Sequence, residues 1–162
     1  MSPNANVSLL LIFSSIAMAL VLTLIPLPHW IAIARPAFFA ATVVYWALME
    51  PRRFGVISAW ICGMFLDASY GTPLGQHALA LAIVTFVVFR FKDLLWSFPL
   101  FQQSLAMLPV FALYEFVLFW IDGANGRNVD FLWRWLPALS TMVVWPFWAL
   151  FLERFAAIEV KS

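Results

Sequence analysis

Two acidic residues, Asp67 and Glu115, lie within or beside long apolar stretches of this sequence. A charged side chain in hydrocarbon is costly unless it is paired or hydrated, so such a residue either has a structural partner or binds protons or a substrate. We predict that Asp67 approaches Arg35, because both are expected at the same outer edge of the membrane. Glu115 is expected in the outer half as well, where it could join Arg35 or reach Arg134. A structural ion-pair network is the simpler interpretation, and proton or substrate binding is the alternative.

Small residues recur at every fourth position just before Asp67, at Gly55, Ala59 and Gly63. On a helix, this spacing places them on one face with Asp67, and small side chains allow another helix to approach closely. Two interpretations stay open. The face either packs inside the molecule or forms a groove for a partner protein.

Histidine and cysteine residues give no support for a metal site or an enzyme. His29 and His77 have no Cys, His or carboxylate neighbour at a metal-ligand spacing, and Cys62 is the only cysteine. The segment between Gly71 and Gly75 lacks the Gly-Lys-Ser/Thr end of a phosphate-binding loop and is interpreted as a tight turn. We therefore expect no metal, no cofactor and no catalysis.

The composition is that of a membrane protein. Of the 162 residues, 65% are hydrophobic and 10% are charged, and the mean hydropathy is +0.95. Ordinary soluble domains are roughly half apolar and about a quarter charged, so most of this surface is expected to face lipid. The chain is predicted to form one transmembrane domain over residues 1–162. Its net charge of +1 and scattered basic residues exclude nucleic-acid binding.

Six apolar segments are candidates for membrane crossing, which takes about 20 helical residues. They span residues 7–25, 36–49, 54–69, 75–90, 100–121 and 135–152. The second segment is short, and if it is re-entrant, five crossings remain. The sequence therefore predicts an all-α integral membrane protein, a bundle of six transmembrane helices with five as the alternative.

The distribution of basic residues predicts the orientation. With a cytoplasmic amino terminus, six of the nine Lys and Arg residues lie inside and three outside, as the positive-inside rule prefers. The six are Arg52, Arg53, Arg90, Lys92, Arg154 and Lys161, and the three are Arg35, Arg127 and Arg134. Both termini are therefore expected in the cytoplasm.

The segment from Asp67 to Leu79, DASYGTPLGQHAL, resembles the Asp-x3-Gly-x2-Leu-Gly-x2-Ala-Leu signature of MreD, a family of rod shape-determining proteins. Further short motifs resemble the family in order and spacing over roughly 35–154. They are Arg35-Pro36, Tyr45-Trp46, Pro51-x-Arg53, Gln102-Gln103, Leu118-Phe119-Trp120 and Trp145-Pro146-Phe147-Trp148.

The resemblance implies a non-catalytic scaffold of the cell-elongation complex in the bacterial inner membrane, which supports peptidoglycan synthesis along the lateral wall. It implies MreC as the direct partner, with MreB, a RodA-type glycosyltransferase and a class B penicillin-binding protein as complex members and membrane lipid around them. The face with Gly55, Ala59 and Gly63 is a candidate groove for the MreC helix, and Trp145 and Pro146 are further partner-binding or structural candidates.

The resemblance also supplies the alternative function. The family is similar in fold to the six-helix substrate-binding components of ECF vitamin transporters. A membrane-embedded binder of a small molecule or lipid intermediate, working as part of a transporter, is therefore the competing hypothesis.

Overall fold

The computed structural model describes residues 8–127, 130–131 and 133–159, which fold into helices without a strand. Residue 7, Lys161 and the side chain of His29, all used in the predictions above, lie outside this description. The helices are α1 (Leu9–Leu24), α2 (His29–Ala32), α3 (Phe38–Met49), α4 (Val56–Tyr70), α5 (Gln76–Arg90), α6 (Lys92–Ser97), α7 (Leu100–Ala124) and α8 (Leu136–Glu159), with a 3-10 turn, η1 (Trp133–Trp135), before α8.

Each of the six predicted segments corresponds to one of the longer helices. Two helical stretches, Leu100–Ala124 and Trp133–Ala157, are long and apolar enough to cross a membrane, and the other four are apolar helices of 10–17 residues. The all-helical fold is therefore confirmed, while the number of crossings stays a prediction. The short helices α2 and α6 were not predicted.

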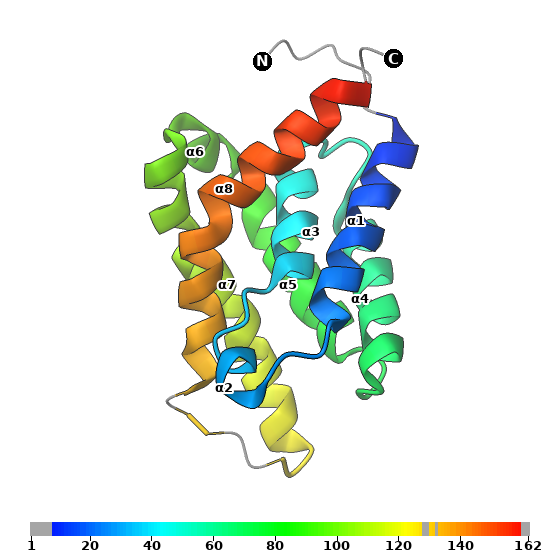
Figure 1. Ribbon diagram of the computed structural model, residues 1–162, viewed down its shortest axis with the longest axis vertical. Coiled ribbons are helices and arrows are strands. Elements are labelled where there is room, and N and C mark those ends of the chain that lie inside the picture. The colour runs from blue at the N-terminus through cyan, green and yellow to red at the C-terminus, as the bar shows by residue number, and fades with distance from the viewer. Residues whose placement is uncertain (1–7, 128–129, 132, 160–162) are drawn as a thin grey trace.

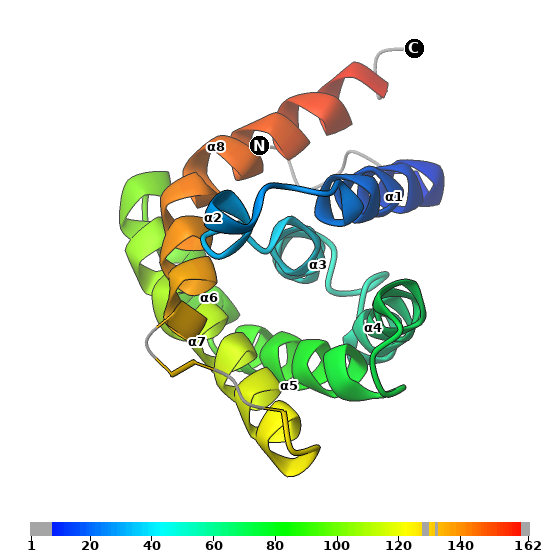
Figure 2. The same cartoon turned by 60° about the horizontal axis from the view of Figure 1, so that its bottom comes forward.

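The helix α3 lies in the middle of the bundle, with α1, α4, α5 and α8 around it (Figure 2). Ten of its 12 residues are buried. A helix that is apolar on every side is stable only where other helices cover it, so the composition of α3 determines this central place.

Hydrogen bonds between tryptophans and hydroxyl groups connect α3 to its neighbours. Trp46 of α3 donates through Nε1 to Ser15 Oγ of α1 at 2.8 Å, and Trp148 of α8 donates to Thr42 Oγ1 of α3 at 3.0 Å. All four side chains are buried, so each indole N–H has the partner that its burial requires. These bonds join α1, α3 and α8.

The outer surface carries large apolar side chains. Phe13, Ile57, Phe86, Phe101 and Phe147 are each at least 65% exposed and come from five different helices. A water-soluble monomer rarely exposes so much apolar area, whereas lipid is a matching solvent for it. The distribution of apolar side chains supports a membrane-embedded bundle.

The first turn of α1 and the last described turn of α8 lie at the same end of the bundle (Figure 1). The ends of α1, α4 and α7 lie at the opposite end, together with α2. We name this second end the distal end.

The small-residue face of α4 packs inside the molecule. Ala59 is fully buried, and a Cβ added to Gly63 would lie 2.8 Å from the carbonyl carbon of His77 and overlap the backbone of Ala78 in α5. A Cβ on Gly55, by contrast, would meet nothing within 4 Å. For Ala59 and Gly63, the structure therefore agrees with the internal-packing interpretation rather than with an open groove.

We expect Gly63→Leu to destabilise the protein, because the added side chain must push α4 away from the α5 backbone. Overpacking of this kind costs about 1–3 kcal/mol or more. Thermal denaturation of the detergent-solubilised protein should show a lowered midpoint, whereas the matched Gly123→Leu variant, which adds the same side chain where a Cβ would meet nothing within 4 Å, should not lower it. Equal midpoints for Gly63→Leu and wild type would show that α4 and α5 are not packed this closely.

Candidate functional site

The carboxylate of Asp67, at the end of α4, caps the beginning of α5. Its Oδ2 accepts hydrogen bonds from the backbone N–H groups of Gly75 at 2.9 Å and Ala78 at 3.3 Å, and its Oδ1 accepts from the N–H of His77 at 2.9 Å. These N–H groups have no partner within their own helix, and the positive end of the helix dipole favours a carboxylate there. Asp67 is completely buried, so these bonds replace the water it has lost.

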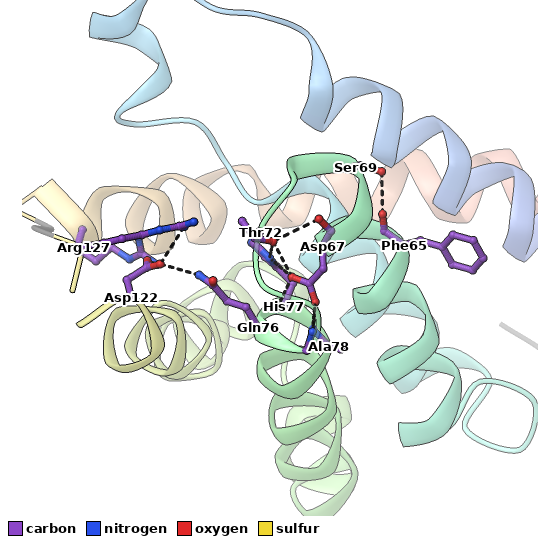
Figure 3. A network of polar contacts seen from close by, with 11 residues as sticks. Phe65, Asp67, Ser69, Thr72, Gln76, His77, Ala78, Asp122 and Arg127 are labelled. Atoms are coloured by element: carbon purple, nitrogen blue, oxygen red, sulfur yellow. Dashed lines mark hydrogen bonds and ion pairs between the residues drawn. The ribbon is translucent and has the colours of Figure 1, made fainter. Parts of the chain in front are cut away.

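Two side chains complete the shell of Asp67 (Figure 3). Thr72 donates its hydroxyl to Asp67 Oδ1 at 2.9 Å, and His77 Nδ1 lies 2.7 Å from the same oxygen. The Thr72 hydroxyl and the Asp67 carboxylate therefore both lie beside the same ring nitrogen of His77, since Thr72 Oγ1 is 3.5 Å from Nδ1. In a hydrolytic triad, the nucleophile and the acid lie at opposite ring nitrogens of the histidine. The arrangement here is therefore suited to stabilising the turn between α4 and α5 rather than to catalysis.

Two glycines give the turn between α4 and α5 its shape. Gly71 has a φ of 65° and ends α4, and Gly75 has a φ of 107° and precedes the first residue of α5. Residues that carry a side chain rarely adopt these left-handed backbone conformations, which explains why glycine occupies both positions. The N–H of Thr72 returns to the carbonyl of Asp67 at 3.2 Å, so the turn is held from both its ends.

The predicted pair between Arg35 and Asp67 is wrong. Arg35 instead donates to the carbonyl oxygens of Thr23 and Ile25, at the end of α1. Carbonyl groups in the last turn of a helix have no partner within the helix, and the negative end of its dipole attracts a cation. Each charge thus binds the end of a neighbouring helix rather than the other charge.

A second polar cluster joins α7, α5 and η1. Arg134 lies 3.2 Å from Glu115 through its Nε and 3.2 Å from Asp122 through its Nη2. Asp122 also accepts a hydrogen bond of 2.8 Å from Gln76 Nε2 and lies 3.5 Å from Arg127 Nη1 (Figure 3). Of the two partners predicted for Glu115, the structure shows Arg134.

The other candidates lie inside the bundle. Trp145 of α8 is buried and donates to Gln103 Oε1 of α7 at 3.2 Å, and the neighbouring Pro146 is a buried proline within α8. A partner-binding role for either residue stays a prediction. His77 is also buried and is part of the Asp67 cluster. Its place in the first turn after the Gly75 cap was the signal that could have indicated this.

A cavity of about 170 Å³ lies between the two clusters, at the distal end of the bundle. Side chains from α1, α3, α4, α5, α7 and α8 line it, and the polar ones include Arg35, Tyr70, His77, Tyr114 and Glu115. Among the described residues, no three His, Cys, Asp or Glu side chains are placed to hold a metal ion.

We expect Asp67→Ala to destabilise the turn between α4 and α5, because it leaves three backbone N–H groups, Thr72 and His77 without their shared acceptor. Removing one partner of such a buried network costs at least about 3 kcal/mol. Hydrogen exchange should accelerate at the first amides of α5, and the thermal midpoint should fall. The matched Asp93→Ala variant removes an exposed carboxylate and should change neither quantity. Unchanged exchange at His77 and Ala78 would contradict the capping role.

No solved structure matches the chain. The rod shape-determining protein MreD of Haemophilus influenzae is 26% identical over 151 residues, which cover 93% of this chain and 92% of that protein. The family model for rod shape-determining protein MreD matches residues 4–155. With nearly its whole length matched, this chain belongs to the MreD family of rod shape-determining proteins.

Proposed function

We propose that this protein is a non-catalytic scaffold of the bacterial inner membrane that docks MreC and supports peptidoglycan synthesis during cell elongation. Membership of the MreD family carries the proposal, because it supports a role in rod shape determination. MreB, a RodA-type glycosyltransferase and a class B penicillin-binding protein are the proposed further members of the complex.

The membrane arrangement proposed for this scaffold is six crossings with both termini in the cytoplasm. Six apolar helices, an apolar exterior, and the placement of the first and last described turns at one end support it. Among the described basic residues, Arg52 and Arg53 follow α3, Arg90 and Lys92 lie at or after the end of α5, and Arg154 lies near the end of α8. Arg35, Arg127 and Arg134 lie near the distal end. Under the positive-inside rule, the distal end then faces away from the cytoplasm.

A scaffold needs a rigid bundle and an accessible surface. The polar clusters make the bundle rigid. Asp67 holds α4 to α5, and Arg134 holds η1 to α7. MreC docking must rely on van der Waals fit and hydrogen bonds, because lipid provides no hydrophobic drive for association. Since Ala59 is already buried and Gly63 already packs against α5, we propose that MreC docks on outward-facing surfaces of the bundle.

The function can be tested by depleting the protein in its host and rescuing the cells with a tagged copy. We expect depleted rods to become round, and we expect MreC to co-purify with the tagged copy that restores the rod outline. Gly63→Leu is not suitable for mapping the docking surface, since its effect on packing would lower the protein level. Rods of normal outline after depletion would contradict the scaffold function, and rescue without co-purified MreC would contradict the docking.

The competing hypothesis is a ligand-binding component of a transporter. The cavity at the distal end is the observation that favours it. A transporter ATPase that co-purifies with the tagged copy, in rods of normal outline, would favour this function over the scaffold.

A further inference from the structure

The cavity at the distal end has a built polar wall. Glu115 is 6% exposed and Tyr114 is 4% exposed, so both side chains are almost entirely enclosed by protein, and both line the cavity. With a volume of about 170 Å³, the cavity is smaller than the roughly 300–1000 Å³ of a drug-sized ligand site. An occupant of this cavity is therefore the size of a small headgroup rather than of a whole cofactor.

Glu115 has a charged partner within the protein, Arg134, but its hydrogen bonding is incomplete. Its ion pair with Arg134 Nε, at 3.2 Å, is too poorly aligned to be a hydrogen bond, and Arg134 Nε is itself a buried donor without an acceptor. No described residue donates a hydrogen bond to Glu115, whereas the nearby Asp122 accepts one from Gln76 at 2.8 Å. A carboxylate that faces a cavity and accepts no hydrogen bond from the described residues favours an N–H or O–H donor in that cavity.

The surrounding side chains favour an ammonium as that donor. The Tyr114 hydroxyl has no hydrogen-bond partner among the described residues, and the rings of Tyr70 and Tyr114 flank His77 at centroid distances of 5.5 and 6.4 Å. Because His77 Nδ1 faces Asp67, Nε2 is left as a further possible acceptor. Aromatic rings together with a carboxylate are a favourable environment for an ammonium group.

Arg35 adds the opposite charge to the same cavity. It lines the wall while two of its nitrogens bind the carbonyls of Thr23 and Ile25. A cavity with a buried carboxylate and a guanidinium is complementary to a zwitterion that carries an ammonium and an anion. Phospholipids with an ethanolamine headgroup have both groups, with a phosphate that guanidinium groups bind well.

We propose that this cavity binds the headgroup of an ethanolamine phospholipid, with the ammonium at Glu115 and the phosphate at Arg35. The source is the membrane itself, because the helices around the cavity expose apolar side chains that acyl chains can cover. These include Tyr70 of α4 and Phe116 of α7, both 44% exposed. This inference does not depend on MreC docking, since it concerns the wall of the cavity.

The test compares lipids with identical acyl chains on the detergent-solubilised full-length chain by native mass spectrometry. We expect phosphatidylethanolamine to be retained about tenfold more strongly than phosphatidylcholine, whose methylated ammonium cannot donate a hydrogen bond. We expect Glu115→Gln to remove this preference and to leave retention of phosphatidylglycerol unchanged. Asp122→Asn is the matched control, because it changes a buried carboxylate that also pairs with Arg134 but does not line the cavity, and it should keep the preference.

Equal retention of phosphatidylethanolamine and phosphatidylcholine by the wild-type protein would overturn the proposal, and this comparison needs no variant that might fail to fold. A preference that survives in Glu115→Gln would also overturn it. Binding of free O-phosphoethanolamine as tight as that of the lipid would overturn the lipid source, whereas much weaker binding would support it.

Discussion

A buried polar group in a membrane-embedded bundle must find its partner within the protein, and the rest of this structure depends on how Asp67 meets that requirement. Its carboxylate closes the first turn of α5 from the last turn of α4. Each unmet hydrogen bond would cost several kcal/mol in hydrocarbon, so the two helices are fixed in orientation as well as in contact. The same requirement explains the remaining interior polar contacts. Tryptophan N–H groups are paired with Ser15, Thr42 and Gln103, and these pairs join α1, α3, α7 and α8.

Much of the fold could be predicted because the lengths of the apolar runs and the turn residues between them are local properties of the sequence. The predicted segment 75–90 differs from α5 by one residue at its start. The last segment was predicted to end at residue 152, before Glu153 and Arg154, but α8 continues to Glu159. Charge ends a hydrophobic run without ending a helix, because Glu and Arg are good helix formers. The short helices α2 and α6 have too few residues for a periodic pattern.

The site was less predictable, because depth in the membrane does not determine which partner a charge selects. Asp67 and Arg35 were expected at one level, yet backbone N–H groups and carbonyls at helix ends competed successfully for them. Backbone partners of this kind cannot be found by matching charged side chains of opposite sign in the sequence. The approach of Glu115 to Arg134 could be predicted from the sequence, since both residues were expected on the outer side of the membrane. Gly63 packs inside the molecule because the short turn after α4 places α5 directly against α4.

The residues that resemble the MreD signature in this chain therefore build a helix junction. Asp67, Gly71 and Gly75 provide a cap and two left-handed backbone positions, and none of them is arranged for catalysis. This geometry agrees with the proposed scaffold function, in which the surface of a rigid bundle contributes to shape determination.

The most direct measurement is rescue of depleted cells by Asp67→Asn, with the rod outline and the amount of folded protein in the membrane scored together. If Asp67 acts only by stabilising the fold, the rod outline should be lost in proportion to the loss of folded protein. Round cells that contain the variant at wild-type level and with wild-type thermal stability would contradict this account.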